Sequence, residues 1–436
     1  MTTGGEAPAL AIRGRVLSFD DDPETAGDAA YTYLEDGAVL IEGGTIASVL
    51  DGADIPAGVD VDHYPGHLVT AGFIDAHVHY PQLGVIASYG GKLIDWLSSY
   101  TFPEESRFAD RDVAAAAAEM FFDELVRNGF TASAVYCTTH PQSVDACFEE
   151  AASRGLRTVA GKVLMDRHAP DELLDTPQEA YDHSKALIEK WHGVGRCLYG
   201  ITPRFAPTSS PEQLEAAGSL FAEHEGVYVQ SHVSEDVREI EWVERLFPEA
   251  GSYLDVYDRF GLLGERALFG HGIHFSDAET ARAAETGTTI VHCPTSNLFL
   301  GSGLFELRKL KGAGIPVALG TDVGGGTSMS PFATMKAAHE IARFHNDAVS
   351  PFECFYLATL GGARALHLGD RIGRLAPGYE ADVTVIDPAS TDLIAQRTGR
   401  AETLGELLFA LIVLADDRAI RATYGNGAKV YDRGRA

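Results

Sequence analysis

The hydrophobic pattern predicts short β-strands near both ends of the chain and an alternation of strands and helices in the middle. Four segments near the two ends read as short strands: residues 10–19, 38–50, 373–387 and 422–434. Gly43-Gly44 and Gly425-Asn426-Gly427 are turn signals within the second and the fourth of these segments. The pattern therefore predicts one small β domain that is assembled from both ends of the chain.

The middle of the chain alternates short β-like runs with helical stretches such as residues 111–127. This alternation is typical of parallel βα units. Eight strand candidates follow one another: residues 72–79, 130–137, 157–166, 197–206, 227–235, 267–274, 289–297 and 316–324. Eight strands close a TIM-type barrel, whose active site lies at the C-terminal ends of the strands.

We therefore predict an α/β fold, with a (β/α)8 TIM-type barrel over residues 67–375. Residues 1–66 and 376–436 are expected to form the smaller composite β-sheet domain, and 436 residues suffice for both. The longest late apolar run, residues 407–415, predicts a packed helix, because a bilayer span needs about 20 residues. The opening residues do not have the pattern of a secretory signal.

Composition and charge narrow the expected partners and compartment. Acidic residues outnumber basic ones 63 to 34, so the formal net charge is −29. Such an acidic surface repels phosphate backbones, and we expect neither a nucleic-acid nor a membrane partner. The five cysteines include no CxxC pair, which disfavours disulfides and favours the reducing cytoplasm. We expect a small-molecule substrate and a homodimer.

Polar residues near the ends of the predicted strands are the candidate site residues. His77 and His79 lie two apart on the first strand, so their imidazoles point to the same side. His232, His271 and Asp322 lie late on the fifth, sixth and eighth strands. Taken singly, the HxH pair can be incidental, His232 and His271 can be partly buried histidines, and Asp322 can be a turn residue. Together at one barrel mouth, they suit zinc or iron(II).

Two further residues receive structural interpretations. His292 is expected to make structural hydrogen bonds rather than to bind a metal ion. Lys162, on the third strand, could be mistaken for the bridging carboxylated lysine of a two-metal site, and the fourth strand supplies no lysine. We therefore expect one metal ion per chain.

Several segments resemble known enzymes. PGHLVTAGFIDAHVHYPQ, QSHVSE, GHGIHFSD and GTDVGGG resemble the amidohydrolase superfamily. Within it, DWLSSYTFPEESRF, GKVLMDR, ITPRFAPTSS and HCPTSNLFLGSG are similar, in the same order, to the guanine deaminase family. The resemblance runs from about residue 65 to 435. The HxH pair is weakly specific, whereas TPRF together with HxxE and CPTSNLxLGSG is strongly specific.

The resemblance implies one zinc ion per chain, with iron(II) as the alternative. The implied metal ligands are His77, His79, His232 and Asp322. His271 is similar to the sixth-strand histidine that the superfamily places beside the metal. We assign it to the reacting water and the substrate, because a closed ligand set would leave no reactive position.

The resemblance also implies the residues that act on the substrate. Glu235 would be the proton shuttle, and Gln82, Arg204 and Phe205 would hold guanine. The planar donor fork of Arg204 suits the O6/N7 edge of guanine, Gln82 can donate and accept, and Phe205 can stack on the ring. The chain departs from the family pattern at Asp236, where an asparagine is expected, which affects only a contact next to the site.

The expected reaction is the hydrolysis of guanine to xanthine and ammonia. A metal ion lowers the pKa of water from about 15.7 to about 7, which makes hydroxide easier to form by on the order of 12 kcal/mol. Asp322 and His271 would orient this water. Glu235 would move its proton to the ring nitrogen beside C2 and then assist the departure of ammonia.

Other interpretations stay open at this point. A related deaminase or chlorohydrolase for another purine, pterin or triazine ring would differ only in the pocket of Gln82 and Arg204. A metal-free barrel with a scaffold role would be expected to have lost ligands. No GxSxG motif or HxE…PCxxC signature is present. Residues 83–108, which carry Trp96, predict a lid or a subunit contact.

Overall fold

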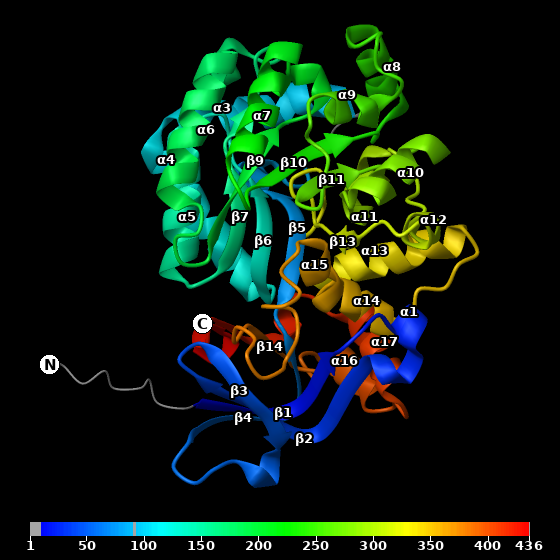
Figure 1. Cartoon of the computed structure of the whole chain (residues 1–436). Helices are drawn as coiled ribbons and strands as arrows, with labels where there is room; N and C mark the ends of the chain where they lie inside the picture. Colours follow the sequence, from blue (N-terminus) through cyan, green and yellow to red (C-terminus); the bar gives the residue numbers. More distant parts are fainter. Residues whose placement is uncertain (1–9, 90–92, 436) are drawn as a thin grey trace, which may run out of the picture.

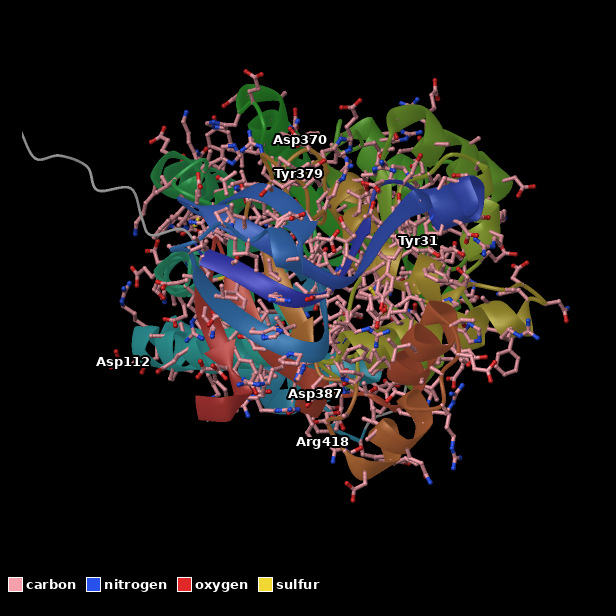
Figure 2. The ribbon with its side chains drawn as sticks, turned by 90° about the horizontal axis from the view of Figure 1, so that it is seen from below. Tyr31, Asp112, Asp370, Tyr379, Asp387 and Arg418 are labelled. Carbon is pink, nitrogen blue, oxygen red and sulfur yellow. The ribbon has the colours of Figure 1, made fainter. Side chains whose placement is uncertain are left out.

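The computed structural model describes residues 10–89 and 93–435. Its strands form two separate sheets, one closed around the middle of the chain and one built from both ends (Figure 1). The barrel sheet is surrounded by helices, and the smaller sheet lies below it in Figure 1. Seen from below, the N-terminal strands lie in front of the barrel (Figure 2).

The barrel contains the eight predicted strands in sequence order. They are β5 (Phe73–His79), β6 (Phe130–Tyr136), β7 (Arg157–Gly161) with β8 (Val163–Leu164), β9 (Cys197–Pro203), β10 (Tyr228–Val233), β11 (Ala267–His271), β12 (Thr289–His292) and β13 (Val317–Leu319). Neighbouring strands pair in parallel from β5 to β13. Backbone hydrogen bonds of 2.9 Å from His79 to Val323 and 2.8 Å from Asp322 to His77 join the last segment to the first. The predicted (β/α)8 barrel is confirmed.

Several predicted strands are shorter in the structure. The seventh candidate, residues 289–297, ends at His292, and a helix begins at Pro294, which fits the first helical position because proline lacks an N–H donor. The eighth candidate ends at Leu319, so Asp322 lies on the loop after β13 and not on the strand. The third candidate divides into β7 and β8, and Lys162 lies between them.

Helices follow most of the barrel strands and cover its outer face. The helices are α1 (Pro23–Ala26), α2 (Leu93–Trp96), α3 (Phe102–Ser106), α4 (Arg111–Arg127), α5 (Pro141–Ser153), α6 (Pro177–Trp191), α7 (Pro211–Glu223), α8 (Val237–Leu246), α9 (Tyr253–Arg259), α10 (Asp277–Thr286), α11 (Pro294–Leu300), α12 (Leu307–Gly312), α13 (Pro331–Phe344), α14 (Pro351–Leu357), α15 (Leu360–Ala365), α16 (Asp392–Thr398) and α17 (Leu404–Leu414). The predicted helix over residues 111–127 is α4. The late apolar run forms α17, which packs against α13 and α14 as predicted. No helix within the described ranges is long and apolar enough to cross a membrane.

The smaller sheet takes strands from both ends of the chain, as predicted. Its order is β16–β15–β14–β4–β1–β2–β3, with β1 (Leu10–Phe19), β2 (Tyr31–Glu42), β3 (Thr45–Asp51), β4 (Asp60–Ala71), β14 (Val383–Ile386), β15 (Ile420–Gly425) and β16 (Ala428–Asp432). Gly43 and Gly44 have positive φ in the β2–β3 turn, a conformation that glycine adopts without steric strain. The domain divisions after residues 66 and 375 stay predictions, and β4 runs on in this sheet to Ala71.

The interior of the barrel is filled largely by small and branched side chains. Alternate strand residues such as Ile74, Ala134, Val159 and Ala318 form a buried cluster inside the strands. Side chains that point outward, such as Phe73 and Val78, join the larger core beneath the helices. Because the barrel is packed below, the polar residues at the strand ends lie at its mouth.

Candidate active site

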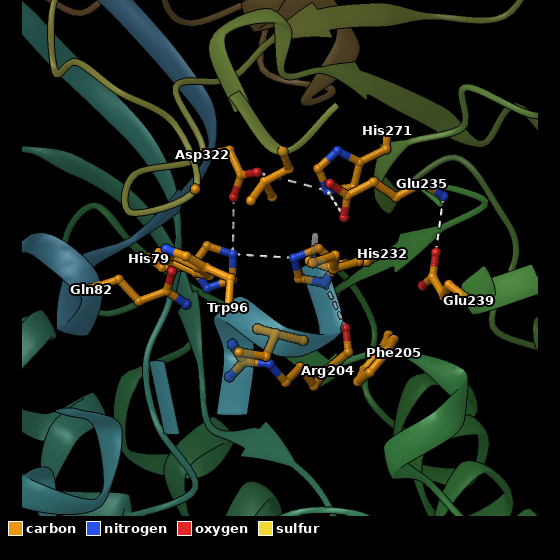
Figure 3. Close-up of a pocket in the computed structure, with 14 residues that line it drawn as sticks. His79, Gln82, Trp96, Arg204, Phe205, His232, Glu235, Glu239, His271 and Asp322 are labelled. Atoms are coloured by element: carbon orange, nitrogen blue, oxygen red, sulfur yellow. Dashed lines mark hydrogen bonds and ion pairs between the residues drawn. The ribbon is translucent and has the colours of Figure 1, made fainter. Parts of the chain in front are cut away.

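Four side chains converge at the mouth of the barrel: His77, His79 and Asp322 are buried, and His232 is half-buried. The Nε2 atom of His232 lies 3.2 Å from Nε2 of His77 and 3.2 Å from Nε2 of His79. The Oδ1 atom of Asp322 lies 3.4 Å from Nε2 of His77 and 3.3 Å from Nε2 of His79. The four ligand atoms all lie within 4.8 Å of one another. Figure 3 shows three of these residues, His79, His232 and Asp322. The structure thus brings together the predicted metal ligands.

A local irregularity in β5 contributes to this convergence. The register of β5 against β6 shifts between Asp75 and Val78, as at a β-bulge, which re-aims side chains at a strand end. Two glycines make room for His77: Gly270 on β11 and Gly320 directly after β13. A Cβ atom on Gly270 would lie 2.5 Å from the His77 ring, and one on Gly320 would lie 2.7 Å from its Cβ. Any larger residue at either position would displace His77.

Burial favours the neutral form of His79 and His232. Burial lowers the pKa of His79 to about 4, although Asp322 opposes the shift. Burial and the neighbouring His77 and His79 hold the pKa of His232 well below its usual value. The Nδ1–H of His232 donates to the Arg204 carbonyl over 2.6 Å, which leaves the Nε2 lone pair facing the other ligands.

The geometry and chemistry of these four residues fit a single metal ion. Atoms that bind one ion at about 2.0–2.1 Å lie no more than about 4.2 Å apart, and the four separations of 3.2–3.4 Å meet this limit. Although burial acts to raise it, contacts with His77 and His79 hold the pKa of Asp322 well below its usual value. Three imidazoles and one carboxylate are a suitable donor set for zinc or iron(II).

Glu235 and His271 lie beside this ligand set. The Nε2 atom of His271 lies 3.3 Å from Glu235 Oε2 and 3.8 Å from Asp322 Oδ2. Burial lowers the pKa of His271 to about 3, so these contacts involve a neutral imidazole at neutral pH. Burial, together with the negative charges of Asp322 and Glu239, raises the pKa of Glu235 well above its usual value. A carboxyl group with a raised pKa beside a ligand set is suited to carry a proton.

Backbone conformation helps to aim these side chains. His271, Asp322 and Ser234, which precedes Glu235, have φ values of 76°, 52° and 47°. Residues other than glycine rarely adopt this left-handed region, and such strained positions cluster at functional sites. Glu239 on α8 holds the Ser234 turn from the other side, because its Oε2 accepts the backbone N–H of Glu235 over 3.0 Å.

A cavity opens beside the ligand set. It is lined by His79, Gln82, Leu93, Trp96, Leu97, Arg204, Phe205, His232, Glu235, Glu239, His271, Leu300, Asp322 and Gly325. The predicted substrate residues and the predicted shuttle therefore face the same space (Figure 3). Trp96 on α2 and Leu97 in the following π-helix (Leu97–Thr101) pack over this cavity, so this part of the 83–108 segment covers the site of its own chain. Residues 90–92 lie outside the described ranges.

Two polar contacts of the site were not predicted from the sequence. Glu105 on α3 is fully buried and contacts both Gln82 and Arg204. Ser302, on the loop after α11, donates to Oε1 of Glu235 over 3.0 Å. Both residues lie in segments that carry the family resemblance, which was the only signal for them.

The other candidate clusters have different explanations. The ammonium group of Lys162 is buried against Asp175 in an ion pair and does not belong to the ligand set. His292 stacks on Phe305 with a centroid distance of 4.2 Å. Its Nδ1 has no hydrogen-bond partner within the described part of the chain, so the expected hydrogen-bonding role is not seen at that atom. Burial raises the pKa of the Cys293 thiol well above its usual value, which disfavours a thiolate ligand beside His271.

An eight-stranded parallel barrel with buried imidazole and carboxylate ligands at its mouth is the arrangement of a hydrolytic barrel enzyme. The chain belongs to the amidohydrolase family, whose pattern matches residues 68–430. It is 44% identical to guanine deaminase of Escherichia coli K12 over 98% of this chain and 99% of the relative.

Solved structures give the same result. The structure of E. coli guanine deaminase matches with a TM-score of 0.95, 44% identity and coverage of 97% of this chain and 100% of that chain. The structure of guanine deaminase from C. acetobutylicum with guanine in its active site matches with a TM-score of 0.88 and 30% identity, over 97% of this chain and 100% of that one.

Proposed function

We propose that this protein hydrolyses guanine to xanthine and ammonia. The observation that carries the proposal is a single cavity that joins the buried ligand set and Glu235 to a wall containing Arg204 and Gln82. The identity of 44% to a guanine deaminase over nearly the whole chain supports the same substrate.

One divalent metal ion belongs to this proposal. Its ligands would be His77, His79, His232 and Asp322, which offer the converging atoms described above. We propose zinc, with iron(II) as the alternative, because neutral imidazole and carboxylate accept both. When bound, the ion supplies Lewis acidity that lowers the pKa of water to about 7.

Glu235 moves the protons in this mechanism. Its carboxylate takes a proton from the attacking water and delivers it to the ring nitrogen beside C2, so that the water oxygen can bond to C2. The carboxylate then takes the remaining proton from the oxygen bonded to C2 and delivers it to the exocyclic amine, which leaves as ammonia while C2 becomes the carbonyl carbon of xanthine. A raised pKa suits a group that acts first as a base and then as an acid.

His271 and Asp322 orient the attacking water in this proposal. Both side chains are buried and lie within 3.8 Å of each other, on the side of the cavity that carries Glu235. Because the imidazole of His271 is neutral, it can hydrogen-bond to water without repelling a metal ion. The two residues therefore restrict the water to one approach toward the ring.

The base is held by Gln82, Arg204 and Phe205 in this proposal. The guanidinium group of Arg204 and the amide of Gln82 supply hydrogen-bond donors at one wall, and Phe205 supplies an aromatic surface. Trp96 and Leu97 add apolar surface to the same cavity, and apolar surroundings strengthen polar contacts.

The proposal is tested by following guanine loss and xanthine formation by ultraviolet absorbance, with ammonia release measured in parallel. Activity that is lost with a chelator and restored by zinc or iron(II) is the expected result. A panel of other purines, pterins and triazines serves as the comparison. If one of these rings were turned over faster than guanine, the proposal that guanine is the substrate would be wrong.

We also propose a cytoplasmic homodimer. The five cysteines are free and buried, which suits a reducing compartment. On the α13–α17 face, Phe344 is 74% exposed, and Phe409 and Val413 are each 37% exposed, which suits a subunit contact. Sedimentation of the purified protein as a monomer at micromolar concentration would contradict the dimer.

A further inference from the structure

A buried carboxylate lies behind the wall of the cavity that carries Gln82 and Arg204. Glu105 is fully buried on the short helix α3. Its Oε1 accepts a hydrogen bond of 3.0 Å from Nε2 of Gln82, and its Oε2 accepts one of 2.5 Å from Nη1 of Arg204. One side chain thus holds both polar residues of the wall, with a separate oxygen atom for each.

These contacts fix which way the Gln82 amide points. The amide oxygen accepts the backbone N–H of Gly324 over 3.2 Å, and the amide nitrogen faces Glu105. An ionised carboxylate can only accept and a backbone N–H can only donate. A flipped Gln82 amide would therefore place its oxygen against the Glu105 oxygen and its NH2 group against the Gly324 N–H. Gln82 therefore keeps its second N–H available as a donor toward the cavity.

The same helix also orients Arg204. The Arg204 guanidinium carbon lies 5.4 Å from the centre of the Phe102 ring, and Phe102 and Glu105 are both on α3. The ion pair takes up one N–H of the planar fork, and the guanidinium has no acceptor atoms. The remaining N–H groups of Arg204 are therefore available as further donors in the wall.

We propose that Glu105 is a positioning residue that determines specificity by keeping this wall rich in hydrogen-bond donors. Such a wall accepts a purine whose facing edge carries acceptors, as a 6-oxopurine does, and opposes one that presents a 6-amino group. This inference rests on the proposed function, because it assigns to Glu105 the preference for a 6-oxopurine over a 6-aminopurine at the same site. Glu105 acts through Gln82 and Arg204 and does not contact the base itself.

The substitution Glu105→Gln tests this inference with almost no change of shape. A carboxylate offers an acceptor oxygen to each of two donors, whereas an amide has one acceptor oxygen and one donor nitrogen. The substituted side chain can therefore satisfy either Arg204 or Gln82 but not both. Glu104→Gln on the same helix is the matched control, because Glu104 pairs instead with the exposed Arg107.

The readouts are KM and kcat for guanine, and the ratio of kcat/KM between guanine and 2,6-diaminopurine, followed by ammonia release. We expect Glu105→Gln to raise KM for guanine by about 10- to 100-fold with kcat within about 3-fold of the parent value. The preference for guanine over 2,6-diaminopurine should fall at least about 10-fold. Metal content and the values for Glu104→Gln should match those of the parent.

A Glu105→Gln protein that is folded, carries metal and keeps the parent's preference would overturn the inference. If this variant is not recovered folded, Glu105→Asp provides the second test, because it keeps both acceptors but withdraws them by one methylene. A raised KM with a smaller loss of preference supports the proposal, and unchanged values overturn it. Absence of guanine turnover in the parent protein would instead contradict the proposed function.

Discussion

Ser302 and Glu235 are joined by a hydrogen bond of 3.0 Å between the serine Oγ and the glutamate Oε1. The bond links the loop after α11 to the turn after β10, across 67 residues of sequence. It favours the ionised form of Glu235 and so opposes the rise in pKa that burial causes. Ser302 therefore adjusts the acidity of the proposed proton carrier.

Replacing Ser302 by alanine is expected to raise the pKa of Glu235 further, because the ionised carboxylate loses a donor. The acidic limb of the pH profile of kcat/KM should move to higher pH, and kcat/KM at pH 7 should fall about 3- to 10-fold. Ser153→Ala, on the exposed end of α5, is the control. An unchanged acidic limb would show that this hydrogen bond does not influence catalysis.

Glu235→Gln is expected to keep the metal and lose turnover. Glutamine has a similar shape but cannot take up a proton, and Glu235 lies outside the group of four ligands. We expect kcat to fall about 10²- to 10⁴-fold, with metal content unchanged by atomic absorption. Glu241→Gln, at an exposed position on α8, is the matched control. Turnover close to the parent value would remove Glu235 from the mechanism.

Arg204→Ala is expected to weaken both guanine binding and folding. The substitution leaves the carboxylate of Glu105 buried without its partner, which costs about 3–5 kcal/mol of stability. The double variant Arg204→Ala/Glu105→Gln removes the unpaired charge, so its melting temperature should recover while KM for guanine stays raised. If KM recovered together with the melting temperature, Arg204 would have only a structural role.

His79→Ala is expected to abolish activity through loss of metal. The substitution removes one of four converging ligand atoms, so the remaining three should hold a metal ion more weakly. Metal stoichiometry should fall from about one per chain to well below one, and kcat with it. His183→Ala, an exposed histidine on α6, controls for the loss of an imidazole. Full metal content in His79→Ala would contradict the assigned ligand set.

Glu239 makes stability depend on pH. Burial raises its pKa to about 7, so the folded protein holds a proton here that the unfolded chain releases at lower pH. Glu239 therefore adds to the free energy of unfolding fully below about pH 4.5. This contribution, on the order of 3 kcal/mol, is lost as the pH rises through about 7. Glu239→Gln stays neutral, so its melting temperature relative to the parent should rise between pH 5 and pH 8. A constant difference over this range would show that Glu239 does not titrate there.

Much of the barrel followed from local patterns along the chain. Strand residues two apart point the same way, so His77 and His79 could be placed on one face from sequence alone. Asp322 was predicted late on the eighth strand, but β13 ends at Leu319, and the left-handed backbone at residue 322 aims the carboxylate from the following loop. The register shift between Asp75 and Val78 in β5 also left no distinct signal in the sequence.

The contacts of Glu105 and Ser302 could not be predicted in the same way. The helix that carries Glu105 has five residues, which is too short to show a helical hydrophobic period. Glu105 and Arg204 are 99 residues apart, and only the packing of α3 against the end of β9 brings them together. The role of Asp236 likewise became clear only in the structure, where its side chain caps α8.

The sequence by itself determined the number of barrel strands and the composite sheet. It also placed His77, His79, His232, His271 and Asp322 near the ends of the predicted strands. These properties depend on periodicity and on the order of elements, and both can be determined from short stretches of the chain. The tertiary structure decided which donors and acceptors face each other inside the cavity. Those contacts depend on how loops from distant strands pack, because only packing fixes the direction of a side chain that no regular period constrains.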